Sequence, residues 1–310
     1  MVSACSEQID ITSAWSLYWR SGKQASFTED EEQLEALCAE WRLFFAGLRK
    51  NAAILDLGTG NGAVLRVAAE FCQDPICFSL HGVDAAEVHP PENLAAQATF
   101  LTGVKIEALP FEDAYFDAVA SQFALEYGDR AQCCAEATRV LRRGGHLKLL
   151  SHAAGGALHS TVRGRVERLS RVLAEGALME VLVTAATEET AAARRAEQAL
   201  QGEWSRLQSA LERAPPADAA VFFANGVANM WRNRHRYNLD DLLASLQAAR
   251  TRSRAILLRL EALQSAACTK EDIDQICCDL RALGMAEVSS SAFLDKAGRQ
   301  LCWVVEAERV

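Results

Sequence analysis

A short apolar segment that runs into three alternating glycines is the feature that most constrains this 310-residue chain. Residues 52–57 (AAILDL) are typical of a buried strand, and Gly58, Gly60 and Gly62 follow it before a helix expected at 63–71. Glycine lets the backbone take positive φ angles and lets a ligand approach it closely. Ligands of open α/β sheets bind beyond the carboxyl ends of the strands. The segment therefore predicts a strand–turn–helix unit that either binds a nucleotide-like ligand or is only a tight turn.

The spacing of the glycines, and two acids near them, indicate the kind of ligand. A dinucleotide site has the pattern G-x-G-x-x-G and binds a pyrophosphate at the helix N-terminus. Here the pattern is G-x-G-x-G and it follows Asp56, a carboxylate that suits an ammonium group and repels a pyrophosphate. Asp84 follows the next expected strand, 76–83, and lies 22 residues after Gly62. A carboxylate there can accept hydrogen bonds from ribose hydroxyls; a solvated acid at a strand end is the plainer alternative.

Strand-like and helix-like segments alternate through the first half of the chain. Further short strands are expected at 99–101, 116–122 and 146–151. A helix is expected at 130–141, ended by the basic and glycine residues 142–145. Because strands alternate with helices over this length, the pattern predicts βαβ units and a parallel sheet.

Residues 157–265 break this alternation, since they contain almost no strand signal. Apolar residues recur at helical spacing from Leu242 to Leu263, with Asn238 as the expected N-cap. We expect four parts: an N-terminal helical cap at 1–50, a ligand-binding α/β core at 51–156, a helical insertion or lid at 157–265, and a final helix with a β-hairpin at 266–310 that completes the core sheet.

Composition excludes several classes of protein. Half of the residues are hydrophobic and 24% are charged, which excludes a disordered or low-complexity chain. The net charge is −9, so the uniformly basic surface of many nucleic-acid-binding proteins is absent. Residues 157–265 contain 15 Arg, no Lys and 12 acids, a formal charge of +3. Within them, the stretch 231–237 (WRNRHRY) either binds an anionic or planar molecule or is a solvated face paired with nearby acids.

The ten cysteines indicate neither a metal site nor a disulfide framework. None forms a C-x-x-C motif, and no Cys/His cluster has the spacing of zinc ligands, so no metal is expected. The first thirty residues lack the pattern of a signal peptide, and no run of about 18 apolar residues occurs. We therefore expect a cytoplasmic protein that does not enter a membrane and uses its cysteines as small hydrophobic residues. The oligomeric state stays open.

Five segments, in this order, resemble the class I S-adenosylmethionine-dependent methyltransferases, in particular small-molecule enzymes of the methyltransferase domain 11-like type. They are residues 54–62, 81–84, 107–119, 121–127 and 139–150. The resemblance implies an α/β, Rossmann-like sheet of seven strands in the order 3-2-1-4-5-7-6, with a large helical insertion between strands 5 and 6. It also implies S-adenosyl-L-methionine as the cofactor.

The resemblance further implies which residues bind that cofactor: Asp56, Gly58, Thr59, Gly60, Gly62, Asp84, Ala85, Ile106, Glu107, Gln122 and Phe123. Within this set, Asp56 faces the ammonium group, Asp84 accepts the ribose hydroxyls, and Phe123 lies near the transferred methyl group. Ala85 and the segment 105–107 border the adenine. Lys105 stands at or beside the place of an adenine-binding Asp in many members, and a lysine has no lone pair to accept a hydrogen bond. Glu107 or a backbone carbonyl is then expected to replace that Asp.

Methyl transfer from a sulfonium depends mainly on the alignment of donor and acceptor, so the reaction needs no fixed catalytic motif. His152 is a candidate base because it follows the expected strand 146–151; a capping or solvated loop histidine is the alternative. We expect transfer to an O or N atom of a small-molecule acceptor. Two alternatives stay open. One is an RNA or protein methyltransferase that docks through the Arg-rich insertion, although the negative net charge speaks against nucleic acid. The other is a non-catalytic binding subunit of the same fold.

Overall fold

The computed structural model describes residues 9–23, 30–71, 78–174 and 218–310, together with the single positions 198, 202, 205, 211 and 214. The chain divides into two compact units. The sheet unit consists of Trp15–Ser160 and Ala262–Val310, and the helical unit consists of Met1–Ala14 and Thr161–Glu261. Each unit is described by itself below.

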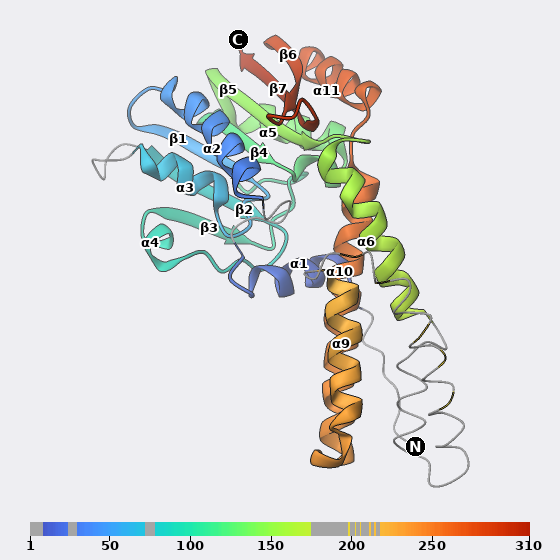
Figure 1. The fold of residues 1–310 in the computed structure, drawn as a ribbon. Coiled ribbons are helices and arrows are strands. Elements are labelled where there is room, and N and C mark those ends of the chain that lie inside the picture. The colour runs from blue at the N-terminus through green and yellow to red at the C-terminus, as the bar shows by residue number, and fades with distance from the viewer. Residues whose placement is uncertain are drawn as a thin grey trace. The chain divides into compact units, whose positions relative to one another are not determined.

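A seven-stranded sheet forms the centre of the sheet unit (Figure 1). Its strands are β1 (Ala52–Leu57), β2 (Phe78–Asp84), β3 (Ala98–Thr102), β4 (Phe116–Gln122), β5 (Leu141–His152), β6 (Met285–Leu294) and β7 (Gln300–Arg309). They lie in the order β3-β2-β1-β4-β5-β7-β6, which confirms the predicted order. The first five strands pair in parallel, whereas β7 is antiparallel to both β5 and β6. The carboxyl ends of β1, β2, β4 and β5 therefore meet at one edge of the sheet.

Helices bury apolar side chains on both faces of this sheet. They are α2 (Glu31–Ala46), α3 (Ala63–Glu70), α4 (Glu92–Ala95), α5 (Arg130–Val140) and α11 (Lys270–Ala282), with the short 3₁₀ helix η1 (Leu125–Tyr127) after β4. On β1, Ile54 packs in one core with residues of α2 and α3, and Leu55 packs in the other with residues of α5 and α11. A strand buried on both faces needs a nearly continuous apolar sequence, which explains the pattern of residues 52–57.

The described residues between β5 and β6 form helices in all their regular elements, as expected for a helical insertion. They are α6 (Ala157–Leu173), α9 (Ala219–Arg232), the 3₁₀ helix η2 (Arg234–Arg236), α10 (Leu239–Ala266) and α11. Within the helical unit, an apolar cluster joins α6, α9 and α10. The buried carboxylate of Asp218 caps α9 and accepts a hydrogen bond of 2.5 Å from Arg168. Asn238 caps α10 as predicted, because its Oδ1 accepts from the Asp241 backbone N–H at 2.8 Å.

The junction between α5 and β5 differs from the sequence expectation. The helix ends at Val140, one residue before its expected end, but β5 already begins at Leu141 instead of His146, and Leu141 pairs with Phe116 of β4. The ladder to β4 then shifts register before Ala118. The Arg309 guanidinium, from β7, donates to the backbone oxygen of Leu141. These partners satisfy the backbone at Leu141, so the chain needs no glycine cap there.

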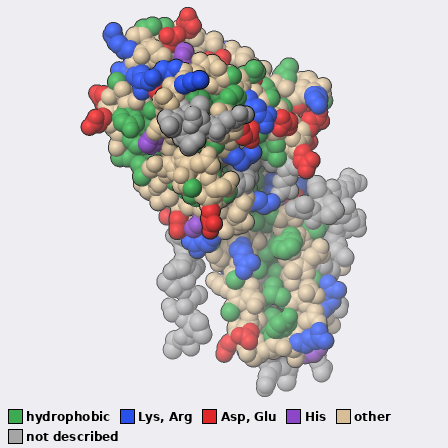
Figure 2. All heavy atoms as spheres, turned by 90° about the vertical axis from the view of Figure 1, so that its left-hand side faces the viewer, with side chains coloured by type: hydrophobic (Ala, Val, Ile, Leu, Met, Phe, Trp, Pro, Cys, Tyr) green, Lys and Arg blue, Asp and Glu red, His purple; other side chains and the backbone are tan. Residues whose placement is uncertain are grey.

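The surface of the molecule carries both charges. On the face drawn in Figure 2, basic and acidic side chains are both present. Among the described residues, every helix is too short or too polar to span a lipid bilayer.

Candidate functional site

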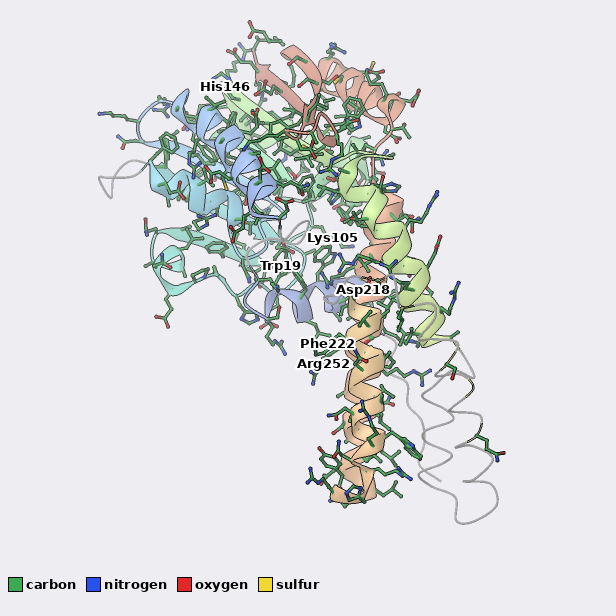
Figure 3. All side chains as sticks on the ribbon, in the orientation of Figure 1. Trp19, Lys105, His146, Asp218, Phe222 and Arg252 are labelled. Carbon is green, nitrogen blue, oxygen red and sulfur yellow. The ribbon has the colours of Figure 1, made fainter. Side chains whose placement is uncertain are left out.

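Only glycine fits the three positions after β1, both because of the backbone angles there and because neighbouring atoms leave no space for a side chain. Gly58, Gly60 and Gly62 have φ angles of +66°, +52° and +84°, which side-chain-bearing residues rarely adopt. A Cβ on Gly58 would lie 2.2 Å from Cβ of Ala124, just past β4. A Cβ on Gly60 would lie 2.5 Å from the ring of Trp19, which is labelled in Figure 3. The loop is therefore packed closely between the end of β4 and the N-terminal helix α1 (Ile11–Trp19).

Contacts across β1 and β2 bring several of the predicted cofactor residues together. The Thr59 backbone N–H donates to the Val83 oxygen at 2.9 Å. A Cβ on Gly82 of β2 would lie 2.7 Å from the Thr59 hydroxyl, so the glycine in this strand makes room for that side chain. The Gly60 N–H donates to Oδ2 of Asp84 at 2.9 Å. The glycine loop and the end of β2 thus form one connected structure, as the sequence predicts.

Asp56 and Asp84 place two carboxyl groups beside this loop, the first buried and the second partly buried. Asp56 is 1% exposed, and its Oδ2 has no hydrogen-bond partner among the described residues. Burial raises the pKa of Asp56 to about 7, and the carboxyl of Asp84 contributes to the rise. Asp84 also accepts from the Ala86 N–H at 2.8 Å, and burial raises its pKa too. Two neighbouring carboxyl groups at this edge of the sheet therefore favour a ligand that carries a positive charge.

The raised pKa of Asp56 predicts a loss of stability as the pH rises. Between about pH 4 and 7 the folded chain keeps the proton that the unfolded chain has lost, so the free energy of unfolding falls with rising pH. By pH 7 this one group accounts for on the order of a few kcal/mol. The measurement is urea unfolding without ligand at about pH 5 and pH 7. The free energy of unfolding should fall less between these two pH values in Asp56→Asn than in the wild type. A variant whose stability falls as steeply as that of the wild type would contradict the prediction.

Asn61 joins the glycine loop to the segment around Trp19 and Lys23 by hydrogen bonds. Its buried side chain donates to the backbone oxygens of Trp19 at 2.9 Å and Lys23 at 2.8 Å, and it accepts from the His89 N–H at 2.7 Å. All its hydrogen-bonding groups are engaged. The sequence analysis gave Asn61 no such role, because an Asn between two glycines is also typical of an ordinary turn.

Aromatic rings lie beside the loop. Trp19 is 7% exposed and stacks on Trp15 with ring centroids 5.7 Å apart. Trp15 also meets Tyr127, which follows β4, edge to face at 6.1 Å. The α1 end is further joined to the loop after β2 by an ion pair of 2.9 Å between Arg20 and Glu87. The N-terminal rings therefore border the loop and the η1 turn together.

Gln122 and Phe123 lie at the carboxyl end of β4, as predicted, and both have fixed conformations. The Gln122 side-chain oxygen accepts from the indole N–H of Trp41 in α2 at 2.5 Å. Phe123 has a φ of +56°, an unfavourable angle for a bulky residue. Its N–H donates to the Leu150 oxygen at 2.7 Å, and its ring stacks on His152 at 4.2 Å. Strained backbone of this kind gathers at functional sites.

His152 is the last residue of β5 rather than a loop residue, and it is 2% exposed. Its Nδ1 has no hydrogen-bond partner among the described residues. Burial, with a smaller contribution from His159, lowers the pKa of His152 to about 3. The imidazole is therefore neutral at physiological pH. Its role as a base stays a prediction.

The residues predicted to border the adenine follow β2 and β3. Ala85 and Lys105 are exposed, and Ile106 packs against the core beneath the sheet. Oε1 of Glu107 accepts from the Asp129 N–H at 3.2 Å, so this carboxylate is joined to the start of α5. Lys105, labelled in Figure 3, offers no acceptor atom on its side chain. The roles of these residues toward an adenine ring stay predictions.

Glu126 is a further buried acid that the sequence analysis did not single out. It lies in η1, directly after β4, and is 3% exposed. Burial raises the pKa of its carboxyl to about 7. The signal that could have found it is an acid within the otherwise apolar segment FALEY (123–127), at the edge of the sheet where ligands bind.

Comparison with known proteins agrees with this geometry. Residues 55–149 match the sequence profile of a family described as a methyltransferase domain. The strand order and the glycine loop after β1 are those that the resemblance predicted for class I methyltransferases. Residues 55–149 are therefore similar to a methyltransferase domain, and they lie in a sheet with the strand order expected for class I methyltransferases. The resemblance to class I methyltransferases implies S-adenosyl-L-methionine as the methyl donor.

Two curated relatives resemble the methyltransferase domain and its surroundings. A malonyl-[acyl-carrier protein] O-methyltransferase from Pseudescherichia vulneris is 30% identical over 170 residues, which cover 52% of this chain and 64% of that protein. A protein of the same name from Herminiimonas arsenicoxydans is 32% identical over 124 residues, which cover 39% of this chain and 45% of the relative. The chain thus spans less than two thirds of the length of the curated relatives it matches.

Among solved structures, the Burkholderia thailandensis 1,6-didemethyltoxoflavin-N1-methyltransferase aligns with a TM-score of 0.47 and 13% identity, over 97% of this chain and 87% of that chain. A possible histamine N-methyltransferase from Thermotoga maritima aligns with a TM-score of 0.44 and 11% identity, over 97% of this chain and all of that chain.

The residues of the methyltransferase domain fit S-adenosylmethionine. The donor carries an ammonium group, and Asp56 has a buried carboxyl oxygen without a partner. The donor also has ribose hydroxyls, and each oxygen of the Asp84 carboxylate keeps a lone pair beyond its backbone N–H donor. The glycines place backbone atoms without side chains beside these two carboxyl groups, and the ring of Trp19 lies against Gly60. The charge and the hydrogen-bonding groups are therefore complementary.

Proposed function

We propose that this protein transfers a methyl group from S-adenosyl-L-methionine to an O or N atom of a small-molecule acceptor. The observation that carries the proposal is the pair of carboxyl groups, Asp56 buried and Asp84 partly buried, beside a loop whose glycines tolerate no side chain. A carboxyl group buried without a partner destabilises the apo protein, and a cationic ligand removes that penalty.

Each part of the site has a distinct task in this proposal. Asp56 binds the ammonium group of the donor, and Asp84 accepts the ribose hydroxyls. Phe123, whose backbone is held by Leu150, places its ring at the end of β4 and orients the reacting groups. The rings of Trp15 and Trp19 exclude water near the loop. The donor supplies an activated methyl group, so alignment and exclusion of water are the main contributions of the protein.

The same proposal assigns the recognition of the methyl acceptor and the covering of the donor to segments outside the sheet. We assign to residues 157–265 the selection of the acceptor as a helical lid, and to residues 1–50 the covering of the donor. The names of the two curated relatives support an oxygen acceptor. The cysteines in the described part of the chain are all free thiols, which supports a reducing, cytoplasmic location.

The proposal is tested with isotope-labelled S-adenosylmethionine, the purified protein and a small-molecule metabolite extract. Mass spectrometry should detect a product that has gained one labelled methyl group, and boiled protein should give none. Calorimetry with S-adenosylhomocysteine should detect binding in the absence of the extract. Absence of binding would favour the non-catalytic alternative. Labelling only of added RNA or protein, with a steep loss at high salt, would favour docking through the arginines of 231–237.

A further inference from the structure

The side chain of Glu126 is buried with half of its carboxyl group unused. Oε1 accepts a hydrogen bond of 2.7 Å from the His152 backbone N–H, which ties the η1 turn to the end of β5. Oε2 has no hydrogen-bond partner among the described residues. An unpaired buried carboxyl oxygen is costly to the fold, so its retention needs a reason other than stability.

A second unpartnered polar atom belongs to the residue that Glu126 contacts. Nδ1 of His152 is buried and lacks a partner in the described part of the chain. The imidazole lies between two rings, stacked on Phe123 at 4.2 Å and edge to face with Tyr127 at 6.2 Å. An unpartnered carboxyl oxygen and an unpartnered ring nitrogen, on two residues joined by a hydrogen bond, are the arrangement expected for a polar ligand.

This pair lies where a methyl acceptor has to approach. Ala124 separates Phe123 from η1 and touches the glycine loop, since its Cβ lies 2.2 Å from the place of a Cβ on Gly58. Glu126 follows two residues later and contacts the end of β5. Both groups are therefore at the carboxyl edge of the sheet, next to the loop assigned to the donor.

The charges around Glu126 leave its carboxyl group without a direct counter-ion. The cation that acts on it is Arg130 of α5, which is already engaged with Asp272 at 2.6 Å and with the Ala266 oxygen at 3.3 Å. The thiols of Cys268 and Cys302 also face it, from the segment before α11 and from β7, and burial raises the pKa of both thiols. Neither these thiols nor the neutral imidazole of His152 carries a positive charge that would lower the pKa of Glu126. Because of burial, its carboxyl group therefore titrates at about pH 7.

We propose that Glu126 is the catalytic base for the acceptor, whose reacting atom carries a hydrogen as a hydroxyl or an amine N–H. The assignment rests on the function proposed above. The O–H or N–H bond breaks and the proton goes to Oε2 of Glu126. The electron pair left on the oxygen or nitrogen forms the bond to the methyl carbon, and the pair of the former carbon–sulfur bond stays with sulfur. His152 positions the acceptor through Nδ1.

The assignment distinguishes between classes of acceptor. A carboxylate acceptor has no proton to lose and would be repelled by a second carboxylate at hydrogen-bond distance. A hydroxyl or an amine both donates to Oε2 and needs its proton removed. The structure thus favours an alcohol, phenol or amine as the acceptor, and not a carboxylate such as the malonyl group in the names of the two curated relatives.

The experiment compares the wild type with Glu126→Gln, Glu126→Asp and the exposed control Glu112→Gln in the labelled-donor assay on the metabolite extract. Glu126→Gln keeps an oxygen for the His152 N–H but cannot take a proton, so labelling should fall about 100- to 10,000-fold. Wild-type labelling should rise with pH through about 7 and then level off, and Glu126→Asp should keep this rise at a lower rate. Affinity for S-adenosylhomocysteine should be the same in all four proteins.

A second measurement reports the protonation of Glu126 and does not depend on catalysis. With S-adenosylhomocysteine present, infrared difference spectra of wild type minus Glu126→Gln should show a carboxylic acid band that disappears as the pH rises through neutral. Labelling by Glu126→Gln at the rate of Glu112→Gln, or a labelled product that is a methyl ester of a carboxylic acid, overturns the inference and leaves the proposed function standing. If the wild type binds no donor or labels nothing, the proposed function fails and the assignment of Glu126 fails with it.

Discussion

Asp84→Ala should bind S-adenosylhomocysteine roughly 100-fold more weakly than the wild type or not at all, because the ribose hydroxyls lose a charged acceptor. Hydrogen bonds to charged groups contribute about 1.5–3 kcal/mol each, and each 1.4 kcal/mol corresponds to about a factor of ten in affinity. Isothermal calorimetry measures the change directly. Asp84→Asn keeps one acceptor oxygen, so its affinity for S-adenosylhomocysteine should lie between those of the wild type and Asp84→Ala.

A matched control is needed because Asp84 also accepts the Gly60 and Ala86 N–H groups. Glu112→Ala removes an exposed acid from the loop before β4 and should leave donor affinity unchanged. Circular dichroism establishes that each variant is folded before binding is measured. Near-normal affinity in a folded Asp84→Ala protein would show that the ribose does not lie at the end of β2.

Gly58→Ala should lower the free energy of unfolding by roughly 2–4 kcal/mol and abolish donor binding. The new methyl group would lie 2.2 Å from Cβ of Ala124, so either the loop or the η1 turn has to move. Overpacking of this kind costs about 1–3 kcal/mol, and alanine at a positive φ adds about 1 kcal/mol. Urea unfolding followed by circular dichroism measures the loss.

Gly103→Ala separates the two causes. Gly103 has a φ of +72° with nothing within 4 Å of the added methyl group, so only the backbone penalty applies there. The difference between the two variants is then the cost of the contact with Ala124. Equal losses in both would mean that the loop relaxes freely and that its close packing has no energetic weight.

The sequence predicted the architecture well where one local rule decides the outcome. The apolar segment 52–57, the glycine spacing and the alternation of strands and helices predicted the parallel part of the sheet and its order through the resemblance. The cap at Asn238 was also predictable, because capping involves neighbours three residues apart. The early start of β5 was not, because Leu141 is held by Phe116 and Arg309, which are distant in the sequence.

Some residues of the site could also be identified from local sequence patterns, and others only from long-range contacts. Asp56 and Asp84 could be named because each stands next to a strand end that the pattern identifies. The role of Asn61 depends on Trp19 and Lys23, some forty residues earlier, and on His89, 28 residues later. Glu126 gains its significance from burial against His152, 26 residues away. No periodicity or motif contains such long-range contacts.

By itself, the order of amino acids determined which strands are buried, where the chain turns and which acids stand at the turns, because these depend on residues within a few positions of one another. Only the tertiary structure decided which polar atoms keep a partner. The missing partners of the Asp56 and Glu126 carboxyl groups appear only when strands and turns from distant parts of the chain close around them and exclude water. Burial is a property of the whole packed unit, and the protonation of these groups follows from it.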